Sequence, residues 1–186
     1  AMMVAYAHDE DTNPVARGHF VSGKLLCFEI QPPSEAVTFP DRDEVGQDET
    51  LRETLERVHT VGACAGCHAL MDPYGWPFEV FDATGRLRSL DRGLPIDATS
   101  EITIPGGFNG KVDDVVQMLD VTAESEVAHV CVSRSLFSYV SGHAADAYED
   151  FECLTDDLAQ AFTEDGDVPA QVVRVLGSPA FQERAE

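Results

Sequence analysis

The sequence predicts a mainly α-helical fold with a short β-hairpin at most, and three observations carry that prediction. Apolar residues recur at helical spacing through most of the 186 residues. Thr50-Leu-Arg-Glu53 is a capping-box pattern that marks the start of a helix. Strand-like alternation of apolar and polar residues is confined to residues 86–109, and there it is weak.

The same patterns place the elements along the chain. Helices are expected over residues 1–30 with a break at Asn13-Pro14, and then over 50–61, 112–119, 124–141, 151–162 and 171–176. Residues 31–40 are expected to form an extended, polyproline-like connector, and residues 41–49 an acidic loop. Residues 71–78 are rich in proline, glycine and aromatic side chains, which predicts a turn-rich loop.

Composition excludes two classes of partner. The formal net charge is −22, from 34 acidic and 12 basic residues, which argues against nucleic acid because phosphate binding depends on Lys and Arg. No run of about 18 apolar residues exists, so no membrane span is expected. The opening Ala1-Met2-Met3 looks like the middle of a helix, and we therefore expect further domains in a longer parent chain.

The most informative stretch is Cys64-Ala-Gly-Cys67-His68, because this spacing is the signature of covalent c-type haem attachment. The two thiols can add to the haem vinyl groups while the adjacent imidazole binds the iron. We therefore expect one covalent haem c, held by Cys64 and Cys67, with His68 as the proximal ligand. The alternatives are a redox disulfide between Cys64 and Cys67, half of a zinc site, and a chance match.

A haem at this position suggests how the chain is organised. Residues 1–40 would form an N-terminal helical arm with the proline-rich connector. Residues 41–122 would form the haem c-bearing domain, which we expect to be cytochrome c-like with extra flanking helices. Residues 123–186 would form a C-terminal helical domain packed on it.

The second axial ligand of the iron is less well determined by the sequence. Its candidates are Met2, Met3, Met71, Met118, His8, His19, His59, His129 and His143. Met71 is excluded by reach, because three residues span at most about 10 Å and the chain would have to pass round the porphyrin edge. We choose Met118, which precedes the longest predicted helix, and then His129. Ordinary core packing of Met118 and a vacant sixth position are the alternatives.

Other residues are assigned to the haem surroundings by type. Trp76, Phe78 and Phe81 would supply apolar walls that exclude water, although ordinary core filling is an equally good account. Arg86 and Arg88 could pair with the haem propionates, and ion pairs with Asp82 or Asp91 are the alternative.

Three cysteines, Cys27, Cys131 and Cys153, lie outside the haem motif. Haem c is attached outside the cytoplasm, where disulfides persist. We therefore expect one bridge, between Cys131 and Cys153, with a Cys27 bridge to either of them as the rival.

These residues carry a resemblance that runs nearly from end to end. Asn13-Pro-Val-Ala-Arg-Gly18, Leu25-Leu-Cys27 and above all the run from Cys64 to Arg88 resemble the C-terminal region of a family of multidomain proteins from planctomycetes and myxobacteria. That region pairs two domains of unknown function and carries a Cys-x-x-Cys-His. Trp76 stands where Phe is usual, and His143 replaces the customary Arg of the second domain. The resemblance implies a secreted or surface, haem-bearing region without established enzymatic activity.

The function expected from these observations is an electron-transfer module that exchanges single electrons with a redox partner protein, in the periplasm or at the cell surface. It would be a carrier rather than an enzyme. The alternatives are a haem sensor or enzyme with an open iron position, and a haem-free binding or structural module with oxidised cysteines. The sequence contains no phosphate-binding loop and no nucleophile-elbow motif that would favour a nucleotide-binding protein or a hydrolase.

Overall fold

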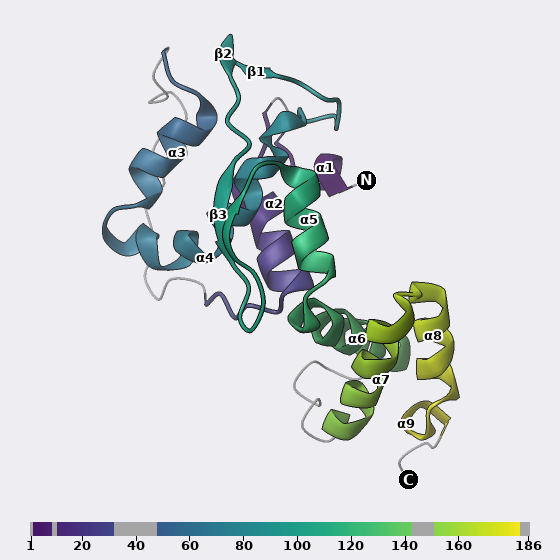
Figure 1. The fold of residues 1–186 in the computed structure, drawn as a ribbon. Helices are drawn as coiled ribbons and strands as arrows, with labels where there is room; N and C mark the ends of the chain where they lie inside the picture. The colour runs from purple at the N-terminus through teal and green to yellow at the C-terminus, as the bar shows by residue number, and fades with distance from the viewer. Residues whose placement is uncertain (1, 9–10, 32–47, 143–150, 183–186) are drawn as a thin grey trace. The chain divides into compact units, whose positions relative to one another are not determined.

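The computed structural model describes residues 2–8, 11–31, 48–142 and 151–182. Within them the chain is mainly helical with two short antiparallel hairpins, which confirms the predicted fold class (Figure 1). The connector predicted around Pro32 and Pro40, most of the acidic loop, and His143 lie outside the described residues. Among the helices of the described part, none has the length and apolar character needed to cross a membrane.

The chain divides into two compact units. The first contains residues 1–23, 28–103 and 109–120, and the second contains residues 24–27, 104–108 and 121–186. Residues 1–23, part of the arm that the sequence suggested for residues 1–40, lie in the same unit as Cys64 and His68.

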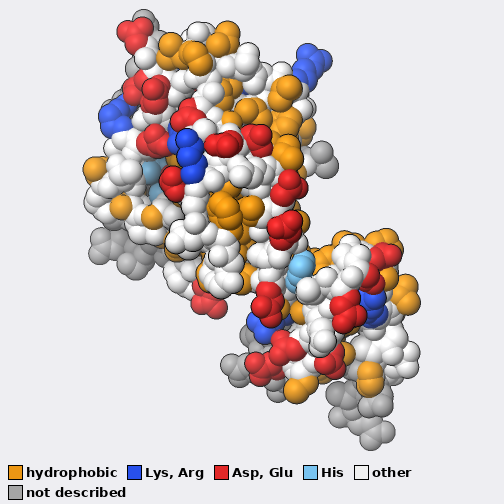
Figure 2. Space-filling model, viewed as in Figure 1, with side chains coloured by type: hydrophobic (Ala, Val, Ile, Leu, Met, Phe, Trp, Pro, Cys, Tyr) orange, Lys and Arg blue, Asp and Glu red, His pale blue; other side chains and the backbone are white. Residues whose placement is uncertain are grey.

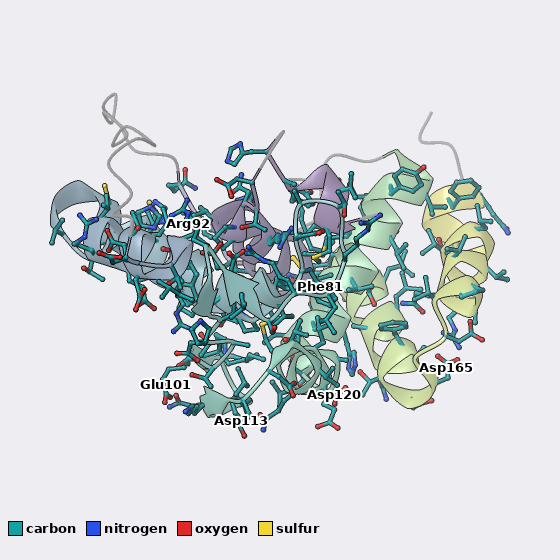
Figure 3. All side chains as sticks on the ribbon, turned by 90° about the horizontal axis from the view of Figure 1, so that it is seen from above. Phe81, Arg92, Glu101, Asp113, Asp120 and Asp165 are labelled. Atoms are coloured by element: carbon teal, nitrogen blue, oxygen red, sulfur yellow. A yellow bond between two sulfur atoms is a disulfide. The ribbon has the colours of Figure 1, made fainter. Side chains whose placement is uncertain are left out.

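The first unit contains short helices and both hairpins. In chain order these are α1 (Met2–Ala5), α2 (Pro14–Phe20), residues 21–23 of the π-helix η1 (Val21–Leu25), α3 (Leu51–His59), the 3₁₀ turn η3 (Gly62–Cys64), α4 (Ala65–Gly75), the 3₁₀ helix η4 (Trp76–Val80), β1 (Leu90–Asp91), β2 (Leu94–Pro95), β3 (Ser100–Thr103) and β4 (Asn109–Val112). Strand β3 pairs with β4 from Ser100 opposite Val112 to Thr103 opposite Asn109. Helix α5 (Val115–Ala123) follows β4 in the chain. The side chains of Glu101 on β3 and of Asp113 just after β4 are both exposed (Figure 3).

Local chemistry accounts for the helix that precedes the cysteine motif. The predicted capping box of α3 is confirmed, since the Thr50 hydroxyl accepts from the Glu53 amide at 3.2 Å and the Glu53 carboxylate accepts from the Thr50 amide at 2.7 Å. The carboxylate of Asp91 accepts a further bond from the Leu51 amide at 2.6 Å. Helix α3 therefore begins at a position that a distant part of the chain also determines.

Helices α2 and α4 cross in backbone contact at a pair of glycines. A Cβ atom on Gly18 would lie 2.1 Å from the carbonyl oxygen of Met71, and one on Gly75 would lie 2.1 Å from that of Pro14. Only residues without a side chain permit this approach. The contact joins the N-terminal helix to the helix that carries His68.

A buried ion network holds the same region together. The Arg17 side chain is fully buried and donates to the carbonyl oxygens of Phe78 and Phe81 at 3.0 and 2.9 Å. Glu79, which is 2% exposed, accepts from Arg88 at 2.9 Å. Burial raises the pKa of the Glu79 carboxyl above its usual value, against the opposing effect of Arg88, and burial lowers the pKa of the Arg17 guanidinium.

The second unit is built from α6 (Glu126–Ser141), α7 (Glu152–Asp165), α8 (Val168–Gly177) and α9 (Pro179–Gln182). Its apolar centre contains Phe137, Leu158 and Val175. Helix α7 ends at Asp165, which Figure 3 labels, and Gly166 follows it in the left-handed conformation, φ 62°, as a helix C-cap often requires. The predicted helices of this unit are thus present, each with bounds shifted by a few residues.

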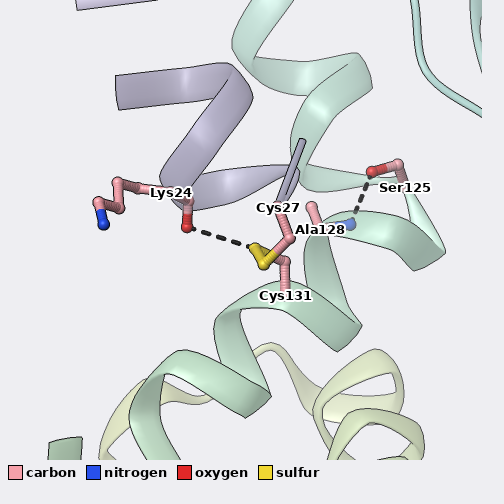
Figure 4. Close-up of a disulfide and its surroundings, with 5 residues drawn as sticks. All are labelled: Lys24, Cys27, Ser125, Ala128 and Cys131. Carbon is pink, nitrogen blue, oxygen red and sulfur yellow. Dashed lines mark hydrogen bonds between the residues drawn. A yellow bond between two sulfur atoms is a disulfide. The ribbon is translucent and has the colours of Figure 1, made fainter. Parts of the chain in front are cut away.

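The disulfide differs from the favoured prediction. Cys131 is bonded to Cys27, and its Sγ also lies 3.5 Å from the Lys24 carbonyl oxygen (Figure 4). The predicted Cys131–Cys153 bridge is therefore wrong, and Cys153 is an exposed free thiol. The physical reason lies at Cys27, whose φ of 52° turns the chain after η1 so that its Sγ reaches α6.

Two secondary-structure predictions are also corrected. The segment expected to be a turn-rich loop over residues 71–78 is helical, in α4 and η4, with Pro73 inside the helix. Helicity survives because the segment makes its own tertiary bonds: Tyr74 is buried and donates to the Thr103 carbonyl at 2.6 Å. Conversely, the N-terminal helical region ends at Leu25 rather than at residue 30.

Candidate haem-binding site

The cysteine motif occupies one turn of 3₁₀ helix and the first turn of α4. Cys64 ends η3, and Cys67 and His68 follow within α4, so that three chemically reactive side chains come from adjacent turns. Cys64 and Cys67 are both half-buried free thiols. The Cys67 thiol donates to the Gln31 carbonyl oxygen at 3.4 Å.

His68 belongs to a three-residue cluster that joins two helices. Its Nδ1 lies 2.9 Å from Asp72 Oδ1, one helical turn further along α4. His59, at the end of α3, has its Nδ1 2.6 Å from the other oxygen, Asp72 Oδ2. The two imidazole rings are stacked, with centroids 3.5 Å apart and planes 26° apart. One carboxylate therefore holds two parallel imidazoles.

A groove of about 450 Å³ runs beside this cluster, and its lining is more apolar than polar. It is lined by Glu56, His59, Thr60, Ala65, His68, Ala69, Asp72, Pro73 and Trp76. The volume falls in the range of small-molecule and cofactor sites, about 300–1,000 Å³. Such a combination of an apolar wall with a few polar groups is typical of a site for a largely hydrophobic ligand.

The guanidinium of Arg52 contacts Trp76, one of the residues that line the groove. The guanidinium of Arg52 is 5.6 Å from the centre of the Trp76 ring, a cation–π distance. Its Nη1 donates to the carbonyl oxygens of Asp97 and Thr99 at 2.8 and 2.6 Å, and its Nε donates to Glu56 at 2.8 Å. The cation–π contact and the bond to Glu56 thus join one side chain to two residues that line the groove.

Of the aromatic residues predicted to surround a haem, Trp76 lines the groove and is 5% exposed. Phe78 is buried in the first unit but does not line the groove. Phe81, labelled in Figure 3, follows η4 and forms an isolated antiparallel β-bridge with Leu87. Their assignment to a haem wall stays a prediction.

The arginines predicted to pair with propionates are engaged differently. The Arg88 side chain forms ion pairs with Glu79 and Asp91, each at 2.9 Å. Arg86 is exposed and its amide donates to Asp82 at 2.9 Å. Arg88 thus forms the ion pair with Asp91 that the alternative account described, whereas the hydrogen bond of Arg86 to Asp82 comes from its backbone.

The predicted axial candidates lie in different places. Met118 is fully buried on α5 and is not among the residues that line the groove. His129 lies on α6 in the second unit, where its Nε2 is 2.8 Å from the Ala123 carbonyl oxygen. Its Nδ1 is 2.9 Å from the Thr163 hydroxyl. The choice of either residue as an iron ligand stays a prediction.

His59 stacks on His68, and in this position it does not suit the role of second axial ligand on the opposite face of an iron. Two imidazoles on opposite sides of one metal have ring centroids about 6 Å apart, because each metal–nitrogen bond is about 2 Å long. The observed separation of 3.5 Å with stacked rings places His59 beside His68 instead.

Sequence reasoning missed Asp72 and Arg52 as residues of this site, and it considered His59 only as one of several candidate axial ligands. Asp72 could have been found, since it lies four residues after His68, the spacing at which helical side chains meet. It was interpreted as a turn residue because Pro73 and Gly75 follow it. His59 and Arg52 carry no such signal, because their contacts depend on how α3 packs.

The surface of the first unit around these elements is rich in carboxylates, in keeping with the net charge of −22; acidic side chains are scattered over the face shown in Figure 2. Among the residues that the structure describes, the acidic side chains that line the groove are those of Glu56 and Asp72.

Comparison with known protein families gives a match to about the first half of the chain. Residues 1–91 match a family model described as PSCyt3: Protein of unknown function (DUF1588). The chain is therefore similar to this family over a segment that includes α2, α3, α4, the cysteine motif and the His59–Asp72–His68 cluster. The searches of curated proteins and of solved structures found no match.

Proposed function

We propose that the first unit binds one haem c covalently and serves as an electron-transfer module. Cys64 and Cys67 would hold the porphyrin through thioether bonds, and His68 Nε2 would bind the iron. The haem, when bound, supplies a one-electron couple. No substrate chemistry is required of the protein.

The observation that carries the proposal is the state of His68. Its Nδ1 is bonded to Asp72, which leaves Nε2 as the ring nitrogen available to a metal. Metal-binding histidines typically donate their other ring N–H to a carboxylate or carbonyl in this manner. Two free thiols, Cys67 directly before His68 and Cys64 one turn earlier, and an adjacent groove of cofactor size complete a donor set that fits haem c.

The remaining lining residues have roles that follow from their chemistry. Trp76, Ala69 and Pro73 would exclude water from one side of the porphyrin, which favours the less charged ferrous state. Arg52 places a positive charge beside Trp76 and contacts the indole ring through a cation–π interaction.

The test is covalent attachment. The full chain is produced in a host that carries the haem c maturation apparatus, and its mass is measured after denaturation. The expected result is the mass of the polypeptide plus one haem, and a reduced spectrum with the sharp bands of a low-spin c-type haem. The Cys64→Ala/Cys67→Ala variant should lose the added mass, whereas Cys153→Ala should keep it. An unmodified wild-type mass under these conditions refutes the proposal.

A second candidate, a haem protein with an open iron position, is favoured by one observation. Among the residues that line the groove in the described part of the chain there is no methionine, and the second histidine, His59, is stacked on His68. Carbon monoxide separates the two functions. Slow or absent binding by the reduced protein supports the carrier with two protein ligands, and rapid binding supports the open site.

The wider setting follows from the chemistry of attachment. We propose a periplasmic or cell-surface location, because haem c attachment and the Cys27–Cys131 disulfide both suit an oxidising compartment. The run from Cys64 to Arg88 also supports kinship with the haem-bearing C-terminal regions of multidomain planctomycete and myxobacterial proteins. The redox partner would then be another protein, and the other domains would belong to a longer parent chain.

A further inference from the structure

We infer that Asp72 is a positioning residue that lowers the reduction potential of the bound haem through His68, and that His59 moderates this effect by sharing the same carboxylate. The inference rests on the proposed function and extends it to the regulation of the potential. It concerns hydrogen bonding around the axial ligand and requires no additional ligand.

The geometry gives Asp72 two simultaneous tasks. Its Oδ1 accepts from His68 Nδ1 at 2.9 Å and its Oδ2 accepts from His59 Nδ1 at 2.6 Å. The Asp72 side chain is 7% exposed, and those of His59 and His68 are 12% and 17% exposed. Charge-assisted bonds in such a partly desolvated place are stronger and less screened than those at a surface.

The bond from His68 to a carboxylate has a definite electronic consequence. It keeps the proton on Nδ1 and draws it toward Asp72, so that the Nε2 lone pair becomes more basic. A more basic axial ligand stabilises the ferric state more than the ferrous state, and the potential falls. The buried negative charge of Asp72 acts in the same direction, because it favours the more positive iron.

His59 weakens this effect because a carboxylate that accepts two bonds gives less to each donor. The shorter distance, 2.6 Å, belongs to His59, so a large part of the carboxylate's charge is engaged away from His68. Without His59, Asp72 would serve His68 alone. The structure thus predicts opposite signs for the loss of Asp72 and the loss of His59.

The stacked rings also argue against a rival use of the cluster as a divalent metal site. Nδ1 binds a metal in the plane of its own ring at about 2 Å. Two rings stacked 3.5 Å apart, with planes only 26° from parallel, have planes that meet well beyond that bond length. The hydrogen-bonded arrangement needs no such convergence. We therefore assign the three side chains to one hydrogen-bonded unit around the axial ligand.

The experiment compares reduction potentials of the full-length, haem-loaded chain by spectroelectrochemical titration at pH 7. Asp72→Asn should shift the ferric–ferrous equilibrium at least tenfold toward the ferrous state, which is about 59 mV for one electron. His59→Phe, which keeps an aromatic ring on His68, should shift it in the opposite direction. Asp113→Asn, which removes an exposed carboxylate of the same unit, should change the equilibrium less than twofold.

A second readout does not depend on haem. In the haem-free protein, the ¹⁵N shifts of His68 should show the tautomer protonated on Nδ1 in the wild type and in His59→Phe, and this preference should be lost in Asp72→Asn. The readout keeps the test decisive even if Asp72→Asn attaches haem poorly.

The outcomes separate the inference from the function on which it rests. A wild-type protein without haem refutes the proposed function. A haem-loaded protein in which Asp72→Asn and Asp113→Asn shift the potential equally, or in which His59→Phe raises it, leaves the proposed function intact and overturns the inference. Opposite shifts together with the expected tautomers support it.

Discussion

Replacing Gly18 by alanine should destabilise the first unit, because the new methyl group has no room between α2 and α4. The added Cβ would lie 2.1 Å from the Met71 carbonyl oxygen and 2.9 Å from the Gly75 amide nitrogen. Both neighbours are backbone atoms of a helix, so neither can rotate away. The two helices have to separate instead.

The size of the effect can be worked out from this clash. The contact is about 1.3 Å shorter than the closest ordinary carbon contact, so the helices must part by a similar distance and lose packing along their whole interface. Overpacking in a well-packed interior costs about 1–3 kcal/mol, and a rigid backbone neighbour favours the upper end. Alanine returns up to about 1 kcal/mol of helix propensity. The net loss should therefore be about 2 kcal/mol.

The assay uses Trp76, the single tryptophan of the chain, which follows Gly75 directly and reports on the first unit. Urea unfolding of the haem-free protein, followed by its fluorescence, should show a lower midpoint for Gly18→Ala. Gly66→Ala is the matched control, because Gly66 lies in α4 with nothing within 4 Å of the added Cβ. It should leave stability unchanged or slightly raised. A midpoint for Gly18→Ala at or above that of the wild type would refute the crossing described here.

Three further outcomes are expected. Replacing Cys27 and Cys131 together by alanine removes the disulfide that spans 104 residues. The free energy of unfolding, followed by circular dichroism, should fall by about 2–5 kcal/mol. Reductant should then have no further effect on the stability of the variant. Thr50→Ala removes half of the capping box and should cost about 1 kcal/mol by the same fluorescence assay, and an unchanged midpoint would count against the cap. Glu79→Gln should reveal a pH dependence: burial raises the pKa of Glu79 above 4.5 in the folded protein, so the folded protein holds that proton to higher pH than the unfolded chain. The stability of the wild type relative to Glu79→Gln should therefore fall as the pH rises from 4.5 through the raised pKa, and a constant difference would contradict it.

Secondary structure was predictable where local signals were strong. The capping box of α3 and the helices that became α6, α7 and α8 follow from side chains within a few residues of one another. The interpretation failed at Pro73 and Gly75, where the local signal favours a turn. There the helix is retained because Gly75 packs on the Pro14 backbone and Tyr74 is bonded to Thr103, both distant in sequence.

The cysteines and the candidate site likewise include features that the sequence predicts and features that it does not. Cys64, Cys67 and His68 are recognisable from spacing alone, because their chemistry must come from one turn of backbone. The disulfide partner of Cys131 could not be recognised from spacing, because Cys27 and Cys153 are both plausible by sequence. The bridge depends on the turn of the backbone at Cys27. These three cysteines cannot be paired by spacing without knowing which backbones approach each other.

The amino-acid order by itself determined the class of fold, the acidic character of the chain and the turn that carries two thiols and an imidazole, because each depends on residues that are neighbours along the backbone. The tertiary structure decided which groups surround that imidazole. His59 arrives on a different helix, and Arg52 reaches Trp76 from the start of that same helix. Their positions follow from the bonds that tie this helix to distant parts of the chain, from Leu51 to Asp91, from Arg52 to Thr99 and from His59 to Asp72. The energies of such interactions exist only once the backbone has folded.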